Sequence, residues 1–281
     1  MKATWIGIAI VVLVGIGLLV SSRNKPAGDG SKAKTPVTTT DNNTTPGTSN
    51  GLDGTVIFSV TDKTAEINNV SEVTMNVDRV QLYNETKGWV DVSSDTKAYK
   101  LLDLKARSES QLYAKATAAA DTYSRVKVTL KDVVVTTKSG AKKQATLPKR
   151  TLEMASTVMV KADATTSVHL DVLADQSLHE TERGNYVFAP VVTLESRSDA
   201  SVETDSAGVV TISDGSVDSS TTLGMDLSGE MKVDFHLDGN LKLQTVNGAI
   251  QIIGGAKTDL NLDSPMKGSS VEGMIQGAVG N

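Results

Sequence analysis

Three histidines carry the side chains best suited to metal binding and acid–base chemistry. His179 is followed by Glu180 and Glu182, so one short stretch holds three possible ligands for a divalent metal ion. The stretch lacks the HExxH spacing that places two imidazoles on one helical face. We therefore weigh a weak metal site at these residues against an ordinary loop or capping role. His236 lies between two apolar residues of an expected strand and has no evident partner.

His169 belongs to a stretch in which apolar and polar residues alternate. Val168 and Leu170 have the parity of a buried face, so we expect His169 and Asp171 to point outward. A paired surface strand explains both side chains without any chemistry.

A set of aspartates in the last third of the chain offers oxygen ligands of the kind that calcium prefers. The set consists of Asp214, Asp218, Asp226, Asp234 and Asp238. These residues lack the dense alternation of acids in an EF-hand loop. We therefore favour solvated turns over a calcium site.

A basic turn surrounds Ser139 and Gly140 without an intervening acid. Its cations are Lys138, Lys142, Lys143, Lys149 and Arg150. Such a turn could contact anionic glycans or lipid head groups. Lysine-rich loops also protect exposed sheet edges from aggregation, which is the alternative interpretation.

Signatures of catalysis are missing from the sequence. It contains no GxSxG nucleophile elbow, no phosphate-binding loop and no dinucleotide-binding fingerprint. It contains no cysteine, which excludes disulfides, thiolate metal ligands, cysteine nucleophiles and lipoprotein acylation. We therefore expect neither enzymatic activity nor a cofactor.

Composition and charge indicate the fold class and exclude one class of partner. Residues 201–281 hold four lysines against eleven aspartates and glutamates, within a chain of net charge −5. An acidic surface repels phosphate backbones, so we do not expect nucleic acid as a partner. Aromatic residues make up only 4% of the chain, while Val, Thr, Ser and Gly recur throughout. This mixture is typical of short strands and turns and predicts an all-β protein.

Residues 123–137 form the longest run of alternating, β-branched residues, and we expect the other strands to pair around it. Its valines change parity at Lys131 and Asp132. Such a slip exposes the buried face unless one residue is absorbed as a bulge or the strand crosses to a second sheet. Residues 72–83 show the same slip at Asp78 and Arg79, so we expect the two strands to bend side by side in a β-sandwich.

The remaining pattern predicts shorter elements. Residues 107–120 are rich in Ala, Glu, Gln and Leu and predict one short helix, and residues 175–183 predict a polar loop or helical turn. Pro190 lies within an expected strand and should place it at an edge or at a bulge. Further strands are expected at residues 55–61, 89–92, 99–104, 144–147, 151–161, 167–173 and 185–196.

The amino-terminal part of the chain predicts attachment to a membrane. Residues 4–20 carry no charge and would form a helix of about 26 Å, the short end of what spans a bilayer. We expect an uncleaved signal anchor over residues 1–22, with cleavage after residues 20–22 as the alternative. A buried soluble helix is disfavoured because the segment has no polar face.

Residues 23–50 predict a disordered linker rich in Thr, Ser and Asn, with too few apolar residues to fold. Four bases within residues 23–34 would by themselves place the bulk of the chain in the cytoplasm. We give more weight to the linker, which is usual for exported modules, and expect the bulk of the chain to lie outside the cell.

Residues 207–267 are expected to form an acidic extension in which glycines separate short apolar runs. A spacing of about ten residues between such breaks indicates a meander of short strands. The extension could add to the sandwich of residues 54–197 or fold as a small second domain. Residues 268–281 are expected to be a flexible tail.

Five successive motifs carry a resemblance to a known family. They are GTVIFSVTD at 54–62, EVTMNVDRVQLY at 72–83, YKLLDL at 99–104, DTYSRVKVTL at 121–130 and DQSLHETERGNYVFAPVV at 175–192. In this order they resemble the domain-of-unknown-function family DUF4382, over about residues 54–196. The resemblance implies an exported prokaryotic β-sandwich similar to prealbumin-like or immunoglobulin-like folds. It implies no activity and no site residues.

Together these features predict a membrane-tethered β-sandwich protein with a structural, adhesive or ligand-binding role at the cell surface. It would be secreted if the amino-terminal segment is cleaved. A cell-surface glycan or protein is the expected partner. The alternative is an exported metal-dependent carbohydrate-binding protein or hydrolase. Assembly into surface filaments by pairing of edge strands is a third possibility.

Overall fold

The computed structural model describes residues 53–63 and 67–255. The predicted anchor (residues 1–22), the linker (23–50), the tail (268–281) and residues 256–267 of the predicted extension lie outside these residues. Within the described part of the chain, no helix is long and apolar enough to cross a membrane. Most of that part is β-strand, which confirms the predicted all-β class.

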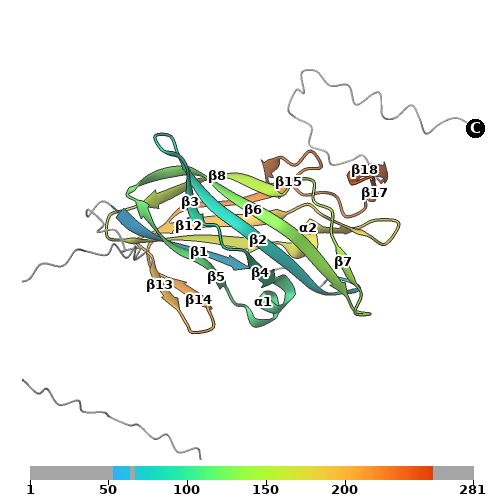
Figure 1. The fold of residues 1–281 in the computed structure, drawn as a ribbon, viewed down its shortest axis with the longest axis horizontal. Helices are drawn as coiled ribbons and strands as arrows, with labels where there is room; N and C mark the ends of the chain where they lie inside the picture. The colour runs from blue at the N-terminus through green and yellow to red at the C-terminus, as the bar shows by residue number, and fades with distance from the viewer. Residues whose placement is uncertain (1–52, 64–66, 256–281) are drawn as a thin grey trace, which may run out of the picture. The chain divides into compact units, whose positions relative to one another are not determined.

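One six-stranded sheet joins the first described strand to strands from the last third of the chain (Figure 1). Its strands are antiparallel except β1 and β9, which run parallel. In spatial order they are β16 (Met231–Val233), β15 (Ser216–Met225), β12 (Val191–Ser198), β9 (Thr165–Val172), β1 (Asp53–Thr61) and β5 (Gln111–Ala119).

The second six-stranded sheet is built around the strand that the sequence placed at the centre. This strand, β6 (Asp121–Thr137), pairs on one side with β2 (Val70–Asn84). On its other side it pairs with β7 (Lys142–Gln144) and then β8 (Thr151–Val160). Strand β2 in turn pairs with β3 (Gly88–Ser93) and β4 (Lys97–Lys100).

Bulges in β2 and β6 resolve the parity slips seen in the sequence. Asn76 lies opposite Asp132 and Val77 opposite Leu130, so Lys131 is an extra residue in β6. Arg79 lies opposite Thr129, which makes Asp78 the extra residue in β2. Each bulge keeps the apolar side chains on both sides of it facing the core. The predicted bend and the predicted pairing of these two strands are confirmed.

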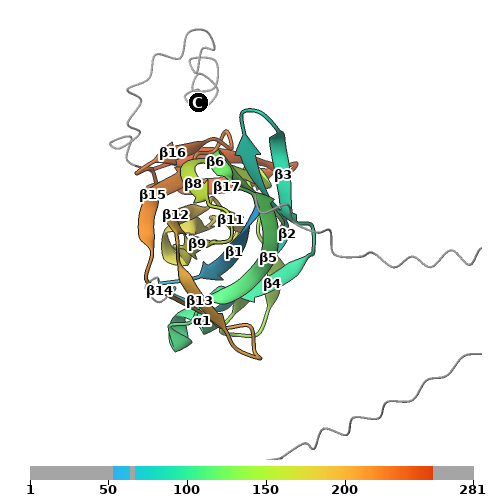
Figure 2. The same ribbon diagram turned by 90° about the vertical axis from the view of Figure 1, so that its left-hand side faces the viewer.

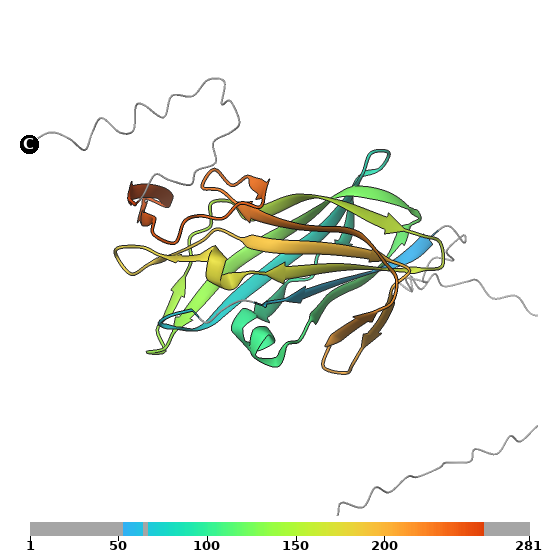
Figure 3. The same ribbon diagram turned by 180° about the vertical axis from the view of Figure 1, so that it is seen from behind.

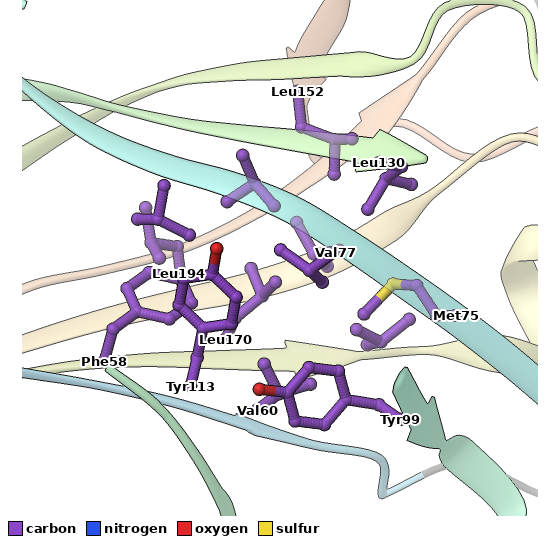
Figure 4. Close-up of a cluster of buried hydrophobic side chains, with 14 of the residues drawn as sticks. Phe58, Val60, Met75, Val77, Tyr99, Tyr113, Leu130, Leu152, Leu170 and Leu194 are labelled. Atoms are coloured by element: carbon purple, nitrogen blue, oxygen red, sulfur yellow. The ribbon is translucent and has the colours of Figure 1, made fainter. Parts of the chain in front are cut away.

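The apolar faces of both sheets contribute to one core. Figure 2 looks along the strands, with β9, β12 and β15 on one side and β2 and β3 on the other. In Figure 4, Phe58, Leu170 and Leu194 of the first sheet approach Val77 and Leu130 of the second. These five side chains are at most 1% exposed. Each contributes about 1.5–3 kcal/mol through removal from water. The closer likeness to prealbumin-like or immunoglobulin-like folds stays a prediction.

The expected strand at 99–104 and helix at 107–120 are wrong. Strand β4 ends at Lys100, and the helix α1 (Leu101–Arg107) follows it directly. Leu101 and Leu104 are three residues apart, so they share the buried face of this helix. The alanine-rich segment becomes β5 because β1 supplies an antiparallel partner along its whole length. Pairing and burial here outweigh a helix propensity of only a few tenths of a kcal/mol per residue, about 0.7 at most.

Pro190 interrupts the strand that was expected over residues 185–196. The chain forms β11 (Tyr186–Phe188), breaks at Ala189 and Pro190, and continues as β12 in the first sheet. The expectation of an edge or a bulge is therefore wrong, because β12 lies between β9 and β15. Proline has no N–H for a ladder, so the chain changes sheets there. The expected loop at 175–183 contains α2 (Ala174–Ser177) and β10 (Leu178–Glu180), which pairs with β11.

The carboxyl-terminal extension adds β15 and β16 to the first sheet and forms two hairpins. One hairpin pairs β13 (Ser201–Thr204) with β14 (Val210–Ser213), and the other pairs β17 (Lys242–Val246) with β18 (Ala249–Gly254). His236 lies outside a strand, contrary to expectation, because β16 already ends at Val233.

Candidate functional site

A hollow of about 670 Å³ lies where β4, α1 and the start of β5 meet the turn between β13 and β14. Figure 3 shows α1 in green beside the brown β13–β14 hairpin. Seven of the twelve residues that line the hollow are polar or charged. The lining residues are Lys97, Ala98, Tyr99, Lys100, Asp103, Leu104, Arg107, Gln111, Leu112, Ser206, Ala207 and Gly208.

Buried anchors hold β4 and α1 in place beneath the hollow. Tyr99 is 2% exposed, and its hydroxyl donates to the carbonyl of Leu112 at 3.3 Å. Its ring lies 6.5 Å from that of Tyr113, centre to centre. No side chain of α1 caps its first turn; instead Glu72 of β2 accepts the N–H of Leu102 at 3.2 Å. Ser108, with φ of 52°, ends the helix in the left-handed conformation.

Three basic side chains surround the hollow. The Nζ of Lys97 donates to the carbonyl of Tyr113 at 2.6 Å. Lys100 lies 3.7 Å from Asp103, and Arg107 lies 2.6 Å from Glu109. The cations of these two pairs are 66% and 53% exposed, and exposed ion pairs contribute about 0–1 kcal/mol. An incoming anion can therefore replace either carboxylate at little cost.

The turn between β13 and β14 forms the wall opposite the bases. Gln111 donates its side-chain amide to the carbonyl of Ala207, and the N–H of Leu112 donates to the carbonyl of Gly208, both at 2.8 Å. Gly208 has φ of +81°, and a Cβ there would lie 2.6 Å from Nε2 of Gln111. The positive φ is the reason that the turn needs a glycine, since the end of the Gln111 side chain can move aside. Asp205 stabilises it by accepting the N–H groups of Ala207 and Val209.

The side chains around the hollow offer hydrogen-bonding and charged groups to a ligand. Burial raises the pKa of both Tyr99 and Tyr113, so their hydroxyls stay protonated at neutral pH and act as hydrogen-bonding groups. Burial, the largest effect on Glu72, also raises the pKa of its carboxyl, against the backbone N–H groups of Val73 and Leu102 that lower it. The lining combines three cations with one carboxylate, Asp103, which favours an anionic ligand.

The basic turn predicted from the sequence does not form one site. Lys138 and Lys142 are exposed near the β6–β7 turn. Lys143 donates instead to the carbonyl of Gly184 and lies 5.9 Å from the ring of Tyr186. Lys149 packs its side chain beside Gly229. The carbonyl of Arg150 accepts the N–H of Leu130 in β6. Leu130 lies some five residues, or about 17 Å, along β6 from the residues that pair with β7.

The three candidate metal ligands point in different directions. His179 is 8% exposed, and within the described chain its Nε2 has no hydrogen-bond partner. Burial lowers the pKa of His179, which favours the neutral imidazole. Glu180 follows it in β10 and is exposed, while Glu182 forms an ion pair with Lys242 at 3.2 Å. Among residues 53–63 and 67–255, no three His, Asp or Glu side chains are grouped to hold a metal ion. The metal-dependent alternative stays a prediction.

Aspartates of the extension take part in turns and ion pairs. Asp226 accepts the N–H groups of Ser228 and Glu230 and lies 2.7 Å from Lys232. Asp238 accepts the N–H of Asn240, and Asp218 accepts the hydroxyl of Ser198. Asp214 and Asp234 adopt positive φ angles of 55° and 51°, as turn residues do. Four of the five therefore lie at turns, as expected, whereas Asp218 lies within β15.

His169 and Asp171 face outward as predicted, but that face is partly covered. Ser59 of β1 lies beside His169, with 2.9 Å between its hydroxyl oxygen and Nδ1. Burial lowers the pKa of His169 to about 4, and Lys63 acts in the same direction. Asp171 is only 7% exposed, and burial raises the pKa of its carboxyl despite Lys63 at 3.7 Å. The strand is paired on both sides, as expected, but these two side chains are more buried than a surface strand implies.

Sequence reasoning missed the basic hollow. The only local signal was a group of bases at Lys97, Lys100 and Arg107, and the expected strand and helix were assigned to the wrong segments there. The opposite wall, residues 206–208, comes from a turn about a hundred residues further along the chain. No pattern in the sequence brings these two segments together.

Comparison with known proteins identifies the domain that contains most of this site. A family model described as Domain of unknown function (DUF4382) matches residues 53–190. The match covers β1 to β11, which includes the whole second sheet and strands β1, β5 and β9 of the first. It confirms the resemblance drawn from the motifs. The wall formed by residues 206–208 lies beyond it. No curated protein and no solved structure matches the chain.

Proposed function

Since residues 53–190 belong to the family Domain of unknown function (DUF4382), we propose that the chain is a membrane-tethered, extracytoplasmic β-sandwich module. Its function would be to bind an anionic ligand at the cell surface without transforming it. The hollow beside α1 is the proposed binding site.

The observation that carries this proposal is the convergence of Lys97, Lys100 and Arg107 on one concave surface. A volume of about 670 Å³ falls within the 300–1,000 Å³ common for small-ligand sites. The bases come from β4 and α1, which Tyr99, Leu101 and Leu104 fix to the core. Little rearrangement is needed on binding, which lowers the entropic cost of association.

Attachment to the membrane is supported by the uncharged residues 4–20 and the polar residues 23–50 that follow them. A flexible linker of this length has a root-mean-square reach of about 30 Å, enough to lift the folded part away from the bilayer. Cleavage of the anchor would instead release the module, with its binding site unchanged.

Calorimetric titration of the full-length protein in detergent tests the proposed ligand class. Citrate and inorganic phosphate serve as the anionic probes and distinguish carboxylate from phosphate recognition, and glucose is the uncharged control. Arg107→Gln and Lys97→Gln should each weaken binding of the preferred anion by about tenfold, the loss expected for one charge-assisted hydrogen bond. Lys105→Gln is the matched control, because Lys105 lies on α1 but does not line the hollow. Absence of heat with both anions, or equal losses in all three variants, would contradict the proposal.

Location is tested separately on intact cells that produce the protein. Protease added outside should degrade residues 53–255 without lysis, while a cytoplasmic marker protein stays intact. Protection of the bulk of the chain until the cells are broken would reject the extracytoplasmic assignment.

A further inference from the structure

The outer face of the second sheet carries a group of aromatic and charged side chains that the hollow does not use. We propose that this group is a second binding site and that it takes an acidic carbohydrate chain. It consists of Tyr83 of β2, Trp89 of β3, Arg125 and Lys127 of β6, and Glu153 of β8. We call it the aromatic–basic cluster.

Strand register brings the members of the cluster together. Tyr83 lies directly opposite Trp89 on one side and Arg125 on the other. Lys127, two residues further along β6, lies opposite Glu153. All five side chains therefore stand on the same outward face, since residues two apart in a strand share a face. The adjacent Leu82, Val126 and Val128 point the other way and are at most 1% exposed.

The two rings of the cluster lie side by side, with their planes inclined at 59° to each other. The ring centres of Tyr83 and Trp89 are 5.2 Å apart. The guanidinium carbon of Arg125 lies 3.8 Å from the centre of the Tyr83 ring and 5.3 Å from that of Trp89. The Nζ of Lys127 lies 3.4 Å from the centre of the Trp89 ring. Cation–π contacts thus hold one cation over each ring, Arg125 over Tyr83 and Lys127 over Trp89.

The charge of the cluster favours an acidic ligand. Among the residues that the structure describes, Glu153 is the one carboxylate in contact with the two cations, 2.6 Å from Arg125 and 4.0 Å from Lys127. The side chains of Arg125 and Glu153 are 37% and 39% exposed, so their ion pair is only weakly stabilising. A ligand carboxylate can displace Glu153 and form bidentate hydrogen bonds with the guanidinium.

A sugar matches this combination of groups better than a nucleic acid does. Pyranose rings present apolar C–H patches that pack on the parts of the two rings left uncovered by the cations, while their carboxylates reach the cations that lie over these rings. Binding of single-stranded nucleic acid instead needs a basic groove that follows many phosphates. Next to the cluster lies an acid, Asp91, which is 57% exposed and 4.0 Å from Arg79. The positive surface is therefore short.

Calorimetry on the full-length protein in detergent tests the proposal with a hexamer of galacturonic acid as the probe. Maltohexaose is the uncharged control of equal length, and a thymidine hexanucleotide tests the competing class of ligand. We expect saturable binding of the acidic hexamer and at least about tenfold weaker binding of the other two. In a Trp5→Phe background Trp89 is the only tryptophan, so a change in its fluorescence on titration would locate the ligand.

Substitutions of opposite sign separate binding from structural effects. Arg125→Gln and Lys127→Gln should weaken binding of the acidic hexamer about tenfold, whereas Glu153→Gln should strengthen it several-fold by removing the competing carboxylate. Lys131→Gln is the matched control, since Lys131 is an exposed base of β6 at the bulge, away from the rings. Thermal unfolding followed by circular dichroism checks that each variant is folded.

Four results would overturn the proposal: no binding of the acidic hexamer, equal binding of maltohexaose, tighter binding of the hexanucleotide, or an equal loss in Lys131→Gln. If Arg125→Gln does not fold, Lys127→Gln and Glu153→Gln still decide the matter through the opposite signs of their effects. A cluster that only stabilises the sheet would lose stability in the variants without any change in carbohydrate binding.

Discussion

Lowering the pH from 7 to 5 is expected to destabilise the protein through the imidazole of His169. This side chain lies half-buried between β1 and β12, with Ser59 at 2.9 Å on one side and Glu195 in the opposite register position on the other. Burial and Lys63 lower its pKa to about 4, while Glu195 acts in the opposite direction. Arg197, 3.2 Å from Glu195, and Asp171 are the other charged groups nearby on this face.

The size of the effect follows from the difference in pKa between the folded and unfolded states. An unfolded histidine titrates near pH 6.5, so between pH 6.5 and 4 the unfolded chain binds a proton that the folded protein does not. Stability therefore rises with pH across this window and is lost as the pH falls. At about 1.36 kcal/mol per pKa unit, the loss between pH 7 and 5 amounts to about 2 kcal/mol. It approaches about 3 kcal/mol near pH 4.

Urea unfolding of full-length protein in detergent, measured at pH 7 and pH 5, provides the assay. His169→Gln keeps a hydrogen-bonding side chain beside Ser59 but cannot be protonated. The variant should therefore lose about 2 kcal/mol less stability than the wild type over this pH interval. His179, whose pKa burial also lowers, is present in both proteins and cancels in the comparison.

Ser59→Ala is the control, because it removes the hydrogen bond while leaving the buried imidazole in place. Its stability should depend on pH as steeply as that of the wild type. Identical pH dependence of the wild type and His169→Gln would refute the reasoning.

Two further perturbations test the hollow and the central strands. Gly208→Ala should weaken binding of the preferred anion by severalfold, because the new Cβ would lie 2.6 Å from Nε2 of Gln111 and push that side chain away from the carbonyl of Ala207, a contact that joins the two walls of the hollow. Gly140→Ala is its control in calorimetry, since φ there is +85° but no atom lies within 4 Å of the added Cβ. Deletion of Lys131 removes the bulge residue of β6, and register pairing then turns half of the strand's valines outward. The deletion should yield insoluble or unfolded protein. The free energy of unfolding of Lys131→Ala, measured by urea titration, should stay within about 0.5 kcal/mol of that of the wild type. A soluble, cooperatively folded deletion variant would show that the bulge is dispensable.

The bulges were predictable from the sequence because they follow from a local rule. Side chains alternate with a period of two, so a change of parity within one strand needs either one extra residue, as found here, or a crossing to a second sheet. The slips at Lys131 and at Asp78 could therefore be found without knowing any partner strand. Their alignment in β2 and β6 supports the antiparallel pairing as well.

The helix at residues 101–107 and the strand at 111–119 could not be assigned correctly from local pattern. Alanine favours the helix by only about a few tenths of a kcal/mol per residue. The ladder with β1 and the burial of Ala114 and Ala118 reverse this preference. In the first turn of helix α1, the N–H of Leu102 donates to Glu72, a residue of strand β2. Both decisions are made by contacts between segments far apart in the chain.

The two candidate sites also differ in how far a local pattern places their residues. Tyr83, Trp89, Arg125 and Lys127 have the outward parity of their strands, so their placement on one face follows from alternation once β2 and β6 are paired. The hollow beside α1 has no such regularity. Its two walls are joined by the hydrogen bonds of Gln111 and Leu112 to the turn at residues 207–208.

By itself, the sequence determined the all-β class, the bent central pair of strands and the family of residues 53–190. These depend on periodicity, composition and ordered motifs, which act over a few residues at a time. Only the tertiary structure decided that the chain passes at Pro190 from the two-stranded β10–β11 sheet to the first six-stranded sheet. The same holds for the division of the predicted basic turn and for the position of Lys97, Lys100 and Arg107 opposite the β13–β14 turn. The physical reason is that burial and hydrogen bonding between distant segments are worth more than local preference, and no local pattern encodes which segments meet.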